Sequence, residues 1–180
     1  MLFLGFSAGL PLLLILGTLS FWLREAGIDR STIGYLTWVG LIYAFKWVWA
    51  PLVDRLQIPF LTKLLGRRRS WLVFAQVLII VGLIGMSNLD PKLALHSMVW
   101  CALLVAFGSA TQDIALDAFR IESANSDHQA ALAATYQTGY RLALIWAGAG
   151  VLWLAARVQV GSDYDASAWQ FAYLCMAASI

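Results

Sequence analysis

Charged side chains are scarce in this sequence. Lysine, arginine, aspartate and glutamate make up 12% of the 180 residues, whereas they make up about a quarter of a typical soluble domain. Hydrophobic residues account for 61%, and the mean hydropathy is +0.75. A net charge of +2 also gives no extended basic surface of the kind that binds nucleic acid. The composition therefore excludes a soluble domain and predicts an integral membrane protein surrounded by the lipid bilayer.

Cysteine and histidine are also scarce. The two cysteines, Cys101 and Cys175, lie within apolar runs, and His96 and His128 stand apart without metal-ligand spacing. The sequence therefore predicts no disulfide framework and no metal site. It contains no glycine-rich phosphate loop and no nucleophile elbow. We expect neither an enzyme nor a bound cofactor.

Apolar runs of about 20 residues, the length of one membrane-spanning helix, alternate with short polar connections. The runs are Phe3–Leu23, Thr32–Leu52, Trp71–Leu89, Leu93–Phe119, Ala130–Ala156 and the stretch from Trp169 onward. They predict an all-α, polytopic transmembrane helical bundle with about six helices. The sixth run has only about a dozen residues before Ile180, too few to span, so we expect it to be truncated. We expect residues 1–180 to be the amino-terminal half of a larger bundle.

The basic residues predict the orientation of the bundle. Residues 53–70, between the second and third runs, hold five of the 12 lysines and arginines. Cytoplasmic loops carry an excess of such residues. We therefore expect residues 53–70 to form a cytoplasmic basic loop and the amino terminus to lie in the cytoplasm.

The fourth run carries a polar stripe at helical spacing. Its members are Ser109, Gln112, Asp113, Asp117 and Arg120. A charge near the bilayer centre costs about 2.5–3.5 kcal/mol, so such residues persist where they bind, relay protons or pair. The polar stripe is compatible with a functional site and also with an ion pair that is only structural. A membrane-embedded hydrolase, in which Asp113 and Asp117 activate water, is a remote alternative.

Lys46, Asp113 and Arg141 are expected at similar depth on three different helices. At a rise of about 1.5 Å per residue, each lies about 10–17 Å from the basic side of the membrane. Two cations and one carboxylate at one level predict a shared cavity for a small anionic solute; a triad that only holds the bundle together is the alternative. The polar groups expected beside them are Tyr43, Gln112, Tyr136, Gln137 and Tyr140.

The connection between the second and third runs also has a candidate switch. Asp54 and Arg55 follow the second run directly, and Gly66-Arg67-Arg68-Arg69 precedes the third. Carboxylate and guanidinium groups at this position can lock or unlock a helix interface. The arginines alone would also fit a loop that only sets orientation, because basic residues are expected there.

Several motifs carry a resemblance to a known family. Asp-Arg followed by Gly-Arg-Arg resembles the signature loop of the major facilitator superfamily, with ten residues, Leu56 to Leu65, where that family usually has one. Five motifs together resemble the AmpG muropeptide permeases. They are Gly5-Phe-Ser-Ala-Gly-Leu-Pro11, Tyr43-Ala-Phe-Lys-Trp-Val-Trp-Ala-Pro-Leu-Val-Asp-Arg55, Gly66-Arg-Arg-Arg-Ser-Trp71, Ser109-Ala-Thr-Gln-Asp-Ile-Ala-Leu-Asp-Ala118 and Gly139-Tyr-Arg-Leu142.

The resemblance implies a twelve-helix secondary transporter of the bacterial inner membrane that imports anhydro-muropeptides for peptidoglycan recycling. Residues 1–180 would be its amino-terminal half, and the missing carboxy-terminal half its partner. The proton would be the coupling ion, with no other cofactor. The Ala-Thr-Gln-Asp-Ile-Ala element also occurs in acetyl-coenzyme A transporters, so transport of acetyl-coenzyme A or another organic anion stays as an alternative.

Within such a transporter, the depth and chemistry of each candidate residue give it an expected role. Asp113, with Asp117 as second candidate, is expected to carry the coupling proton. The solute is expected to contact Lys46, Arg141, Gln112, Tyr43 and Tyr140. The conformational switch is expected to include Asp54, Arg55, Arg67 and Arg68.

Overall fold

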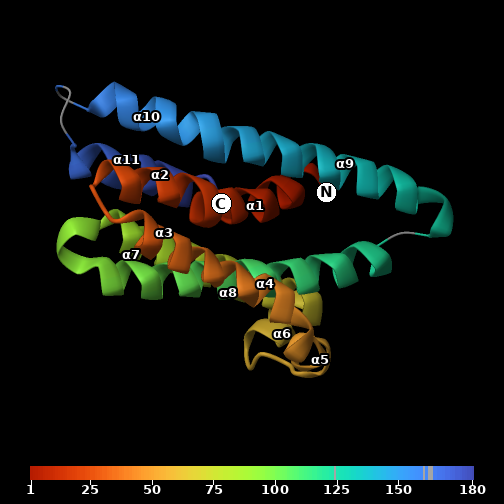
Figure 1. The fold of residues 1–180 in the computed structure, drawn as a ribbon. Coiled ribbons are helices and arrows are strands. Elements are labelled where there is room, and N and C mark those ends of the chain that lie inside the picture. The colour runs from red at the N-terminus through yellow and green to blue at the C-terminus, as the bar shows by residue number, and fades with distance from the viewer. Residues whose placement is uncertain (124, 160, 162–163) are drawn as a thin grey trace.

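The computed structural model describes residues 1–123, 125–159, 161 and 164–180. Within this part of the chain, all regular structure is helical and no strand occurs. The long helices run alongside one another as an elongated bundle (Figure 1). The predicted all-α membrane bundle is confirmed.

Four helical stretches in the described residues are long and apolar enough to cross a bilayer, by length and composition. They are Leu2–Glu25, Arg67–Ser87, Pro91–Glu122 and Asp127–Val158. These stretches correspond to the first, third, fourth and fifth predicted runs, with ends that differ by a few residues. Hydropathy locates them well because every apolar span must match the same bilayer thickness.

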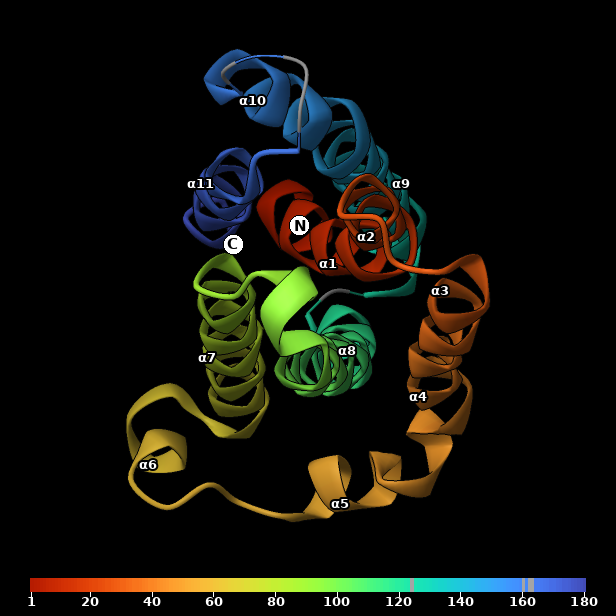
Figure 2. The same cartoon turned by 60° about the vertical axis from the view of Figure 1, so that its left-hand side comes forward.

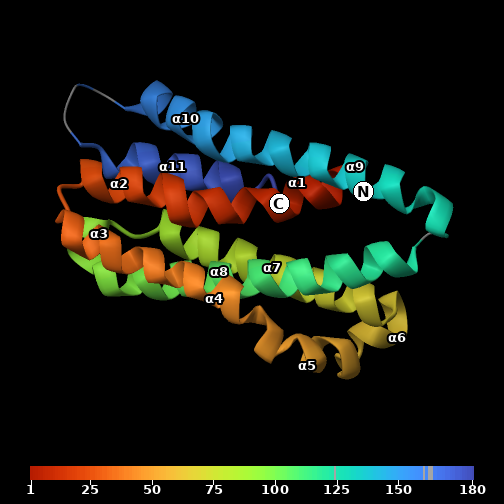
Figure 3. The same cartoon turned by 45° about the vertical axis from the view of Figure 1, so that its right-hand side comes forward.

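The second predicted span, Thr32–Leu52, is a series of short helical pieces rather than one α-helix. The pieces are α3 (Arg30–Leu36), η2 (Thr37–Gly40), α4 (Leu41–Phe45), η3 (Lys46–Val48) and α5 (Ala50–Arg55). η2 and η3 are 3₁₀ turns. Pro51 has no backbone N–H to donate to the preceding turn, which accounts for the break at Trp49. Figure 3 shows α3 and α4 as one rod, with α5 set off from it.

The first span lies at the centre of the bundle. It consists of α1 (Leu2–Leu13), the π-helical turn η1 (Leu14–Thr18) and α2 (Leu19–Glu25). Seen along the bundle, it is surrounded by α9, α11, α7, α8 and α3 (Figure 2). The bounds of these neighbours are α7 Arg67–Ser87, α8 Pro91–Glu122, α9 Ser126–Ile145 and α11 Ala166–Ala177.

Helices α1 and α9 touch through glycines. A Cβ atom on Gly5 would lie 2.1 Å from the backbone oxygen of Tyr136, and one on Gly139 would lie 2.0 Å from that of Leu2. No side chain larger than hydrogen fits at either position, so the two backbones are in direct contact. Small residues allow such close approach between membrane helices.

Two π-helical turns lie side by side further along the same pair of helices. η1 contacts η4 (Trp146–Gly150), which continues α9 into α10 (Val151–Val158). The Thr18 hydroxyl donates to the Ala147 carbonyl at 2.7 Å, and the Tyr173 hydroxyl donates to the Leu14 carbonyl at 2.9 Å. Backbone carbonyls within both π-helical turns are therefore bonded by side chains of other helices.

The bundle has two chemically distinct ends. The basic end holds α5, the short helix α6 (Leu61–Leu65) and the first turn of α7, so part of the expected basic loop 53–70 is helical. At the opposite end, Trp22 donates to the Tyr164 hydroxyl, which donates to Asp90 at 3.0 Å. Burial raises the pKa of Tyr164 to about 12, so this phenol stays protonated and can donate.

Candidate functional site

An ion pair lies part of the way along the bundle. The Lys46 ammonium is 3.5 Å from a carboxylate oxygen of Asp113, which joins η3 to α8. Their side chains are 37% and 22% exposed. In a membrane-spanning segment, such a pair lowers the energy of both charges while leaving each of them accessible.

Three tyrosines surround this ion pair. Tyr43 on α4 and both Tyr136 and Tyr140 on α9 are near enough to Asp113 to interact with it electrostatically. The Tyr43 hydroxyl is buried, and Ser109 approaches it without a hydrogen bond of good geometry. The rings of Tyr136 and Tyr140 are 6.2 Å apart. Helices α4, α8 and α9 thus converge on a polar surface that combines one carboxylate, one ammonium and three phenols.

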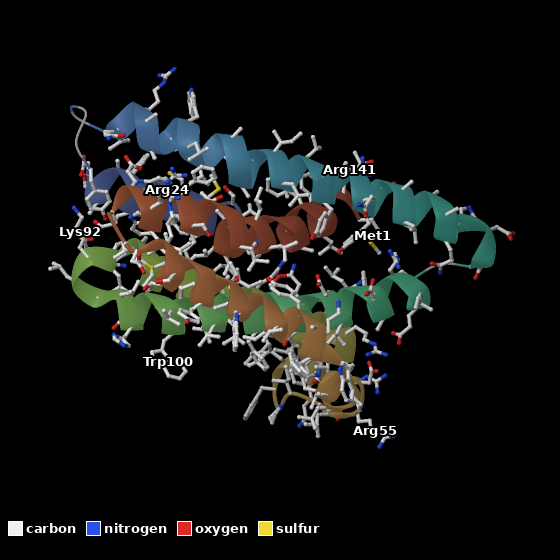
Figure 4. All side chains as sticks on the ribbon, in the orientation of Figure 1. Met1, Arg24, Arg55, Lys92, Trp100 and Arg141 are labelled. Atoms are coloured by element: carbon white, nitrogen blue, oxygen red, sulfur yellow. The ribbon has the colours of Figure 1, made fainter. Side chains whose placement is uncertain are left out.

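Arg141 is exposed on α9, next to Tyr140 in the chain. Figure 4 labels it part of the way along that helix, away from both ends of the bundle. No ion pair joins Arg141 to a carboxylate in the described ranges. The structure therefore brings Lys46 and Asp113 into contact but leaves Arg141 outside that pair.

Gln112 lies apart from the exposed polar surface. Its side chain is fully buried, and its amide donates to the Ser7 hydroxyl of α1 at 3.0 Å. Gln76 of α7 donates to the same hydroxyl at 3.3 Å. The polar stripe on α8 thus divides, because Gln112 faces α1 whereas Asp113 faces Lys46. In this conformation Gln112 does not reach the surface on which we expected it.

Asp117 lies one helical turn beyond Asp113 and has a different partner. Its carboxylate is 3.5 Å from Arg120, and its side chain is 58% exposed. Arg120 also lies over the Tyr136 ring, 5.7 Å from the centroid. The two carboxylates are therefore held by separate cations rather than paired, an arrangement that gives no shared site for water activation.

A second charged cluster lies at the basic end of the bundle. Arg68 donates to Asp54 at 2.6 Å and to Glu122 at 2.8 and 3.0 Å. One guanidinium thus ties together the end of α5, the start of α7 and the end of α8. Arg55 and Arg67, which we also expected in the switch, are exposed and make no ion pair among the described residues. Glu122 was missed, because no spacing in the sequence relates it to Arg68, 54 residues earlier.

A helical membrane bundle with an accessible ion pair between its ends is an arrangement that membrane transporters use to bind solutes and relay protons. A family model described as acetyl-coenzyme A transporter 1 matches residues 1–147. The chain belongs to this transporter family.

Two curated relatives extend the likeness to nearly the whole chain. An anhydromuropeptide permease of Escherichia coli strain K12 is 41% identical over 178 residues, which cover 99% of this chain and 34% of the permease. The putative transporter AmpG 4 of Rickettsia felis is 38% identical over 174 residues, covering 97% of this chain and 40% of the relative. The expected resemblance to AmpG permeases is confirmed, and these relatives are named as a permease and a transporter rather than as enzymes. The chain spans about a third to two fifths of these relatives.

Proposed function

We propose that the complete protein is a secondary transporter that imports anhydro-muropeptides across the bacterial inner membrane together with protons. The Lys46–Asp113 ion pair carries this proposal, because it places a protonatable carboxylate beside a cation that an anionic solute can occupy. The relatives that are named as an anhydromuropeptide permease and an AmpG transporter support the choice of solute.

The chemistry of symport follows from competition for one cation. When solute carboxylates bind Lys46, the ammonium no longer neutralises Asp113, so a proton binds this carboxyl more easily. Solute and proton then bind together and leave together. Arg141 serves as a second anchor, since its guanidinium can hold a carboxylate through two hydrogen bonds. Tyr43 and Tyr140 offer hydroxyls and ring faces to the sugar.

Residues 1–180 contribute one half of the transporter in this proposal. The exposed surface of α4 and α9 faces the second half, so that the solute binds between the two. The end with Arg55, Lys63 and Arg67–Arg69 lies in the cytoplasm, as the excess of positive charge favours. The amino terminus of α1 lies at the same end and is therefore cytoplasmic as well.

Transport of acetyl-coenzyme A or another organic anion is the second candidate, and the description of the matching family model favours it. Acetyl-coenzyme A carries phosphates, which Lys46 and Arg141 could also bind. An anhydro-muropeptide presents sugar rings and a peptide to the site, whereas acetyl-coenzyme A presents a nucleotide.

Uptake by the complete protein in vesicles separates these candidates. With an inward proton gradient, labelled anhydro-muropeptide should accumulate inside, and unlabelled muropeptide should compete in the micromolar to millimolar range. Acetyl-coenzyme A at the same concentration should not compete. Accumulation of acetyl-coenzyme A, with no effect of muropeptide, would establish the second candidate instead.

The Arg68 cluster leads to a prediction about the conformational cycle. Asp54→Asn removes the charge that Arg68 contacts at the end of α5, and should lower the uptake rate by about tenfold by destabilising one state by about 1.4 kcal/mol. The equilibrium Kd of the solute should change by less than about twofold, because the cluster lies at the membrane edge.

Stopped-flow uptake and equilibrium binding on the same preparation measure both quantities. Lys63→Gln is the matched control, since Lys63 is exposed on α6 and makes no ion pair among the described residues. A large rise in Kd for Asp54→Asn would place Asp54 in the solute site.

A further inference from the structure

A hollow opens between α2 and α3 at the end of the bundle opposite the basic end. Its volume is about 220 Å³, and its lining residues are Ser20, Phe21, Arg24, Arg30 and Ile33. Arg24 is labelled on α2 in Figure 4. Both charged residues of the lining are arginines, so the hollow presents only positive charge to whatever enters it.

Neither arginine is neutralised by a carboxylate in the part of the chain that the structure describes. The acidic neighbours in the chain have other partners. Glu25 accepts a hydrogen bond from the Trp169 indole at 2.8 Å, and Asp29 accepts one from Ser31. The five N–H donors of each guanidinium are therefore available to an anion.

An adjoining hollow enlarges the space. It has a volume of about 400 Å³ and shares Phe21 and Arg24 with the first, while Glu25, Leu152 and Trp169 complete its lining. Phe21 is 56% exposed between the two. Sites for small molecules usually measure about 300–1,000 Å³ and combine apolar surface with a few polar groups. The adjoining hollow falls in this range, with Phe21 as an apolar floor for a ring, while its one carboxylate, Glu25, restricts the anionic group of a solute to the hollow that the two arginines line.

One segment of chain joins the hollow to Lys46 of the ion pair. α2 continues α1 through η1, and α3 leads through α4 to Lys46. Arg30 precedes Lys46 by 16 residues, which is about 24 Å at the rise of an α-helix and somewhat more where Thr37–Gly40 is a 3₁₀ turn. A solute that first occupies the hollow would therefore have to move about 24 Å along this segment to reach Lys46.

We propose that Arg24 and Arg30 form an outer anion-binding site, which takes the carboxylate of a sugar-sized solute while the ring lies against Phe21. The site precedes the Lys46–Asp113 pair on the route through the protein. This inference rests on the proposed function for the direction of transport and the kind of solute. The recognised chemistry is an anionic group, which a membrane lipid headgroup also carries.

Protection from chemical modification tests the site directly. The complete protein, in phosphatidylcholine vesicles, is treated with phenylglyoxal, which modifies accessible arginines, and mass spectrometry follows each position. N-acetylmuramic acid at about four times its Kd should slow modification of Arg24 and Arg30 about fivefold. N-acetylglucosamine, which lacks the carboxylate, should not. Arg157 is the matched control, since it is exposed near the same end and lies over the Trp153 ring.

Two results would overturn the proposal. Equal protection by both sugars, or by neither, would exclude a carboxylate site. If vesicles with phosphatidylglycerol protect both arginines, and N-acetylmuramic acid adds nothing in either vesicle, the anion is a lipid headgroup and the solute site is refuted.

A transport measurement separates this site from the proposed function. The double variant Arg24→Gln with Arg30→Gln should raise KM for muropeptide uptake about tenfold at unchanged kcat. A lower kcat with unchanged KM would contradict the inference. If the wild-type protein takes up no muropeptide, the proposed function fails, while the protection experiment still decides whether the site binds a carboxylate.

Discussion

Asp113→Asn should abolish proton-driven accumulation of the solute. One pH unit stores about 1.4 kcal/mol per proton, enough for about tenfold accumulation if one proton accompanies each solute. Asparagine cannot release a proton at Asp113, so the variant should bring the inside and outside concentrations to a ratio of about 1. Downhill exchange of solute should persist, because the asparagine side chain keeps the volume and hydrogen bonding of the site.

The measurement compares accumulation under an imposed pH gradient with counterflow exchange without one. Asp117→Asn is the informative comparison, since that carboxylate is 58% exposed and pairs with Arg120 at the end of α8. We expect it to retain accumulation. If Asp113→Asn still concentrates solute while Asp117→Asn does not, the coupling role belongs to Asp117, and the Lys46–Asp113 pair is structural.

Gly139→Ala should strongly destabilise the protein. The added methyl group would lie 2.0 Å from the backbone oxygen of Leu2, so α1 and α9 must move apart. Overpacking of a tight contact costs about 1–3 kcal/mol, and more where only backbone can yield. We expect the apparent Tm of the purified complete protein to fall by at least about 5 °C.

Gly34→Ala provides the matched control. Gly34 lies in α3 with no atom within 4 Å of the added Cβ. Alanine has the higher helix propensity, so this variant should be neutral or more stable by less than about 1 kcal/mol. Thermal unfolding in detergent and the amount of protein recovered from membranes measure both variants. A Tm of Gly139→Ala within about 1 °C of the wild type would show that the helices separate at little cost.

The sequence predicted the continuous spans because a bilayer imposes one length on all of them. It did not predict the division of Thr32–Leu52 into short pieces. Hydropathy does not register the missing N–H of Pro51 or the 3₁₀ turns at Thr37–Gly40 and Lys46–Val48. Prediction from hydropathy alone therefore fails where the backbone departs from the α-helix.

The candidate site was predictable only in part. A similar depth was enough to group Lys46 with Asp113, and the two are in contact. The direction in which each side chain faces was harder to predict. Gln112 and Asp113 are adjacent on α8, yet a rotation of about 100° per residue turns one toward α1 and the other toward η3. Glu122 and Arg68 come into contact only when the chain is folded, and no spacing in the sequence indicates this contact.

The π-helical turns at Leu14–Thr18 and Trp146–Gly150 have a consequence for how this family can change. A π-helical turn accommodates one residue more than an α-helical turn. Removing that residue from η1 would let the turn close as an ordinary α-helical turn, so that Phe21 and Arg24 would keep their present neighbours. The Leu14 carbonyl, which now accepts from the Tyr173 hydroxyl, would then be offered a partner within its own helix. A single-residue deletion at either turn is therefore expected to preserve the helix faces and to change the hydrogen bonds that other helices make to that turn.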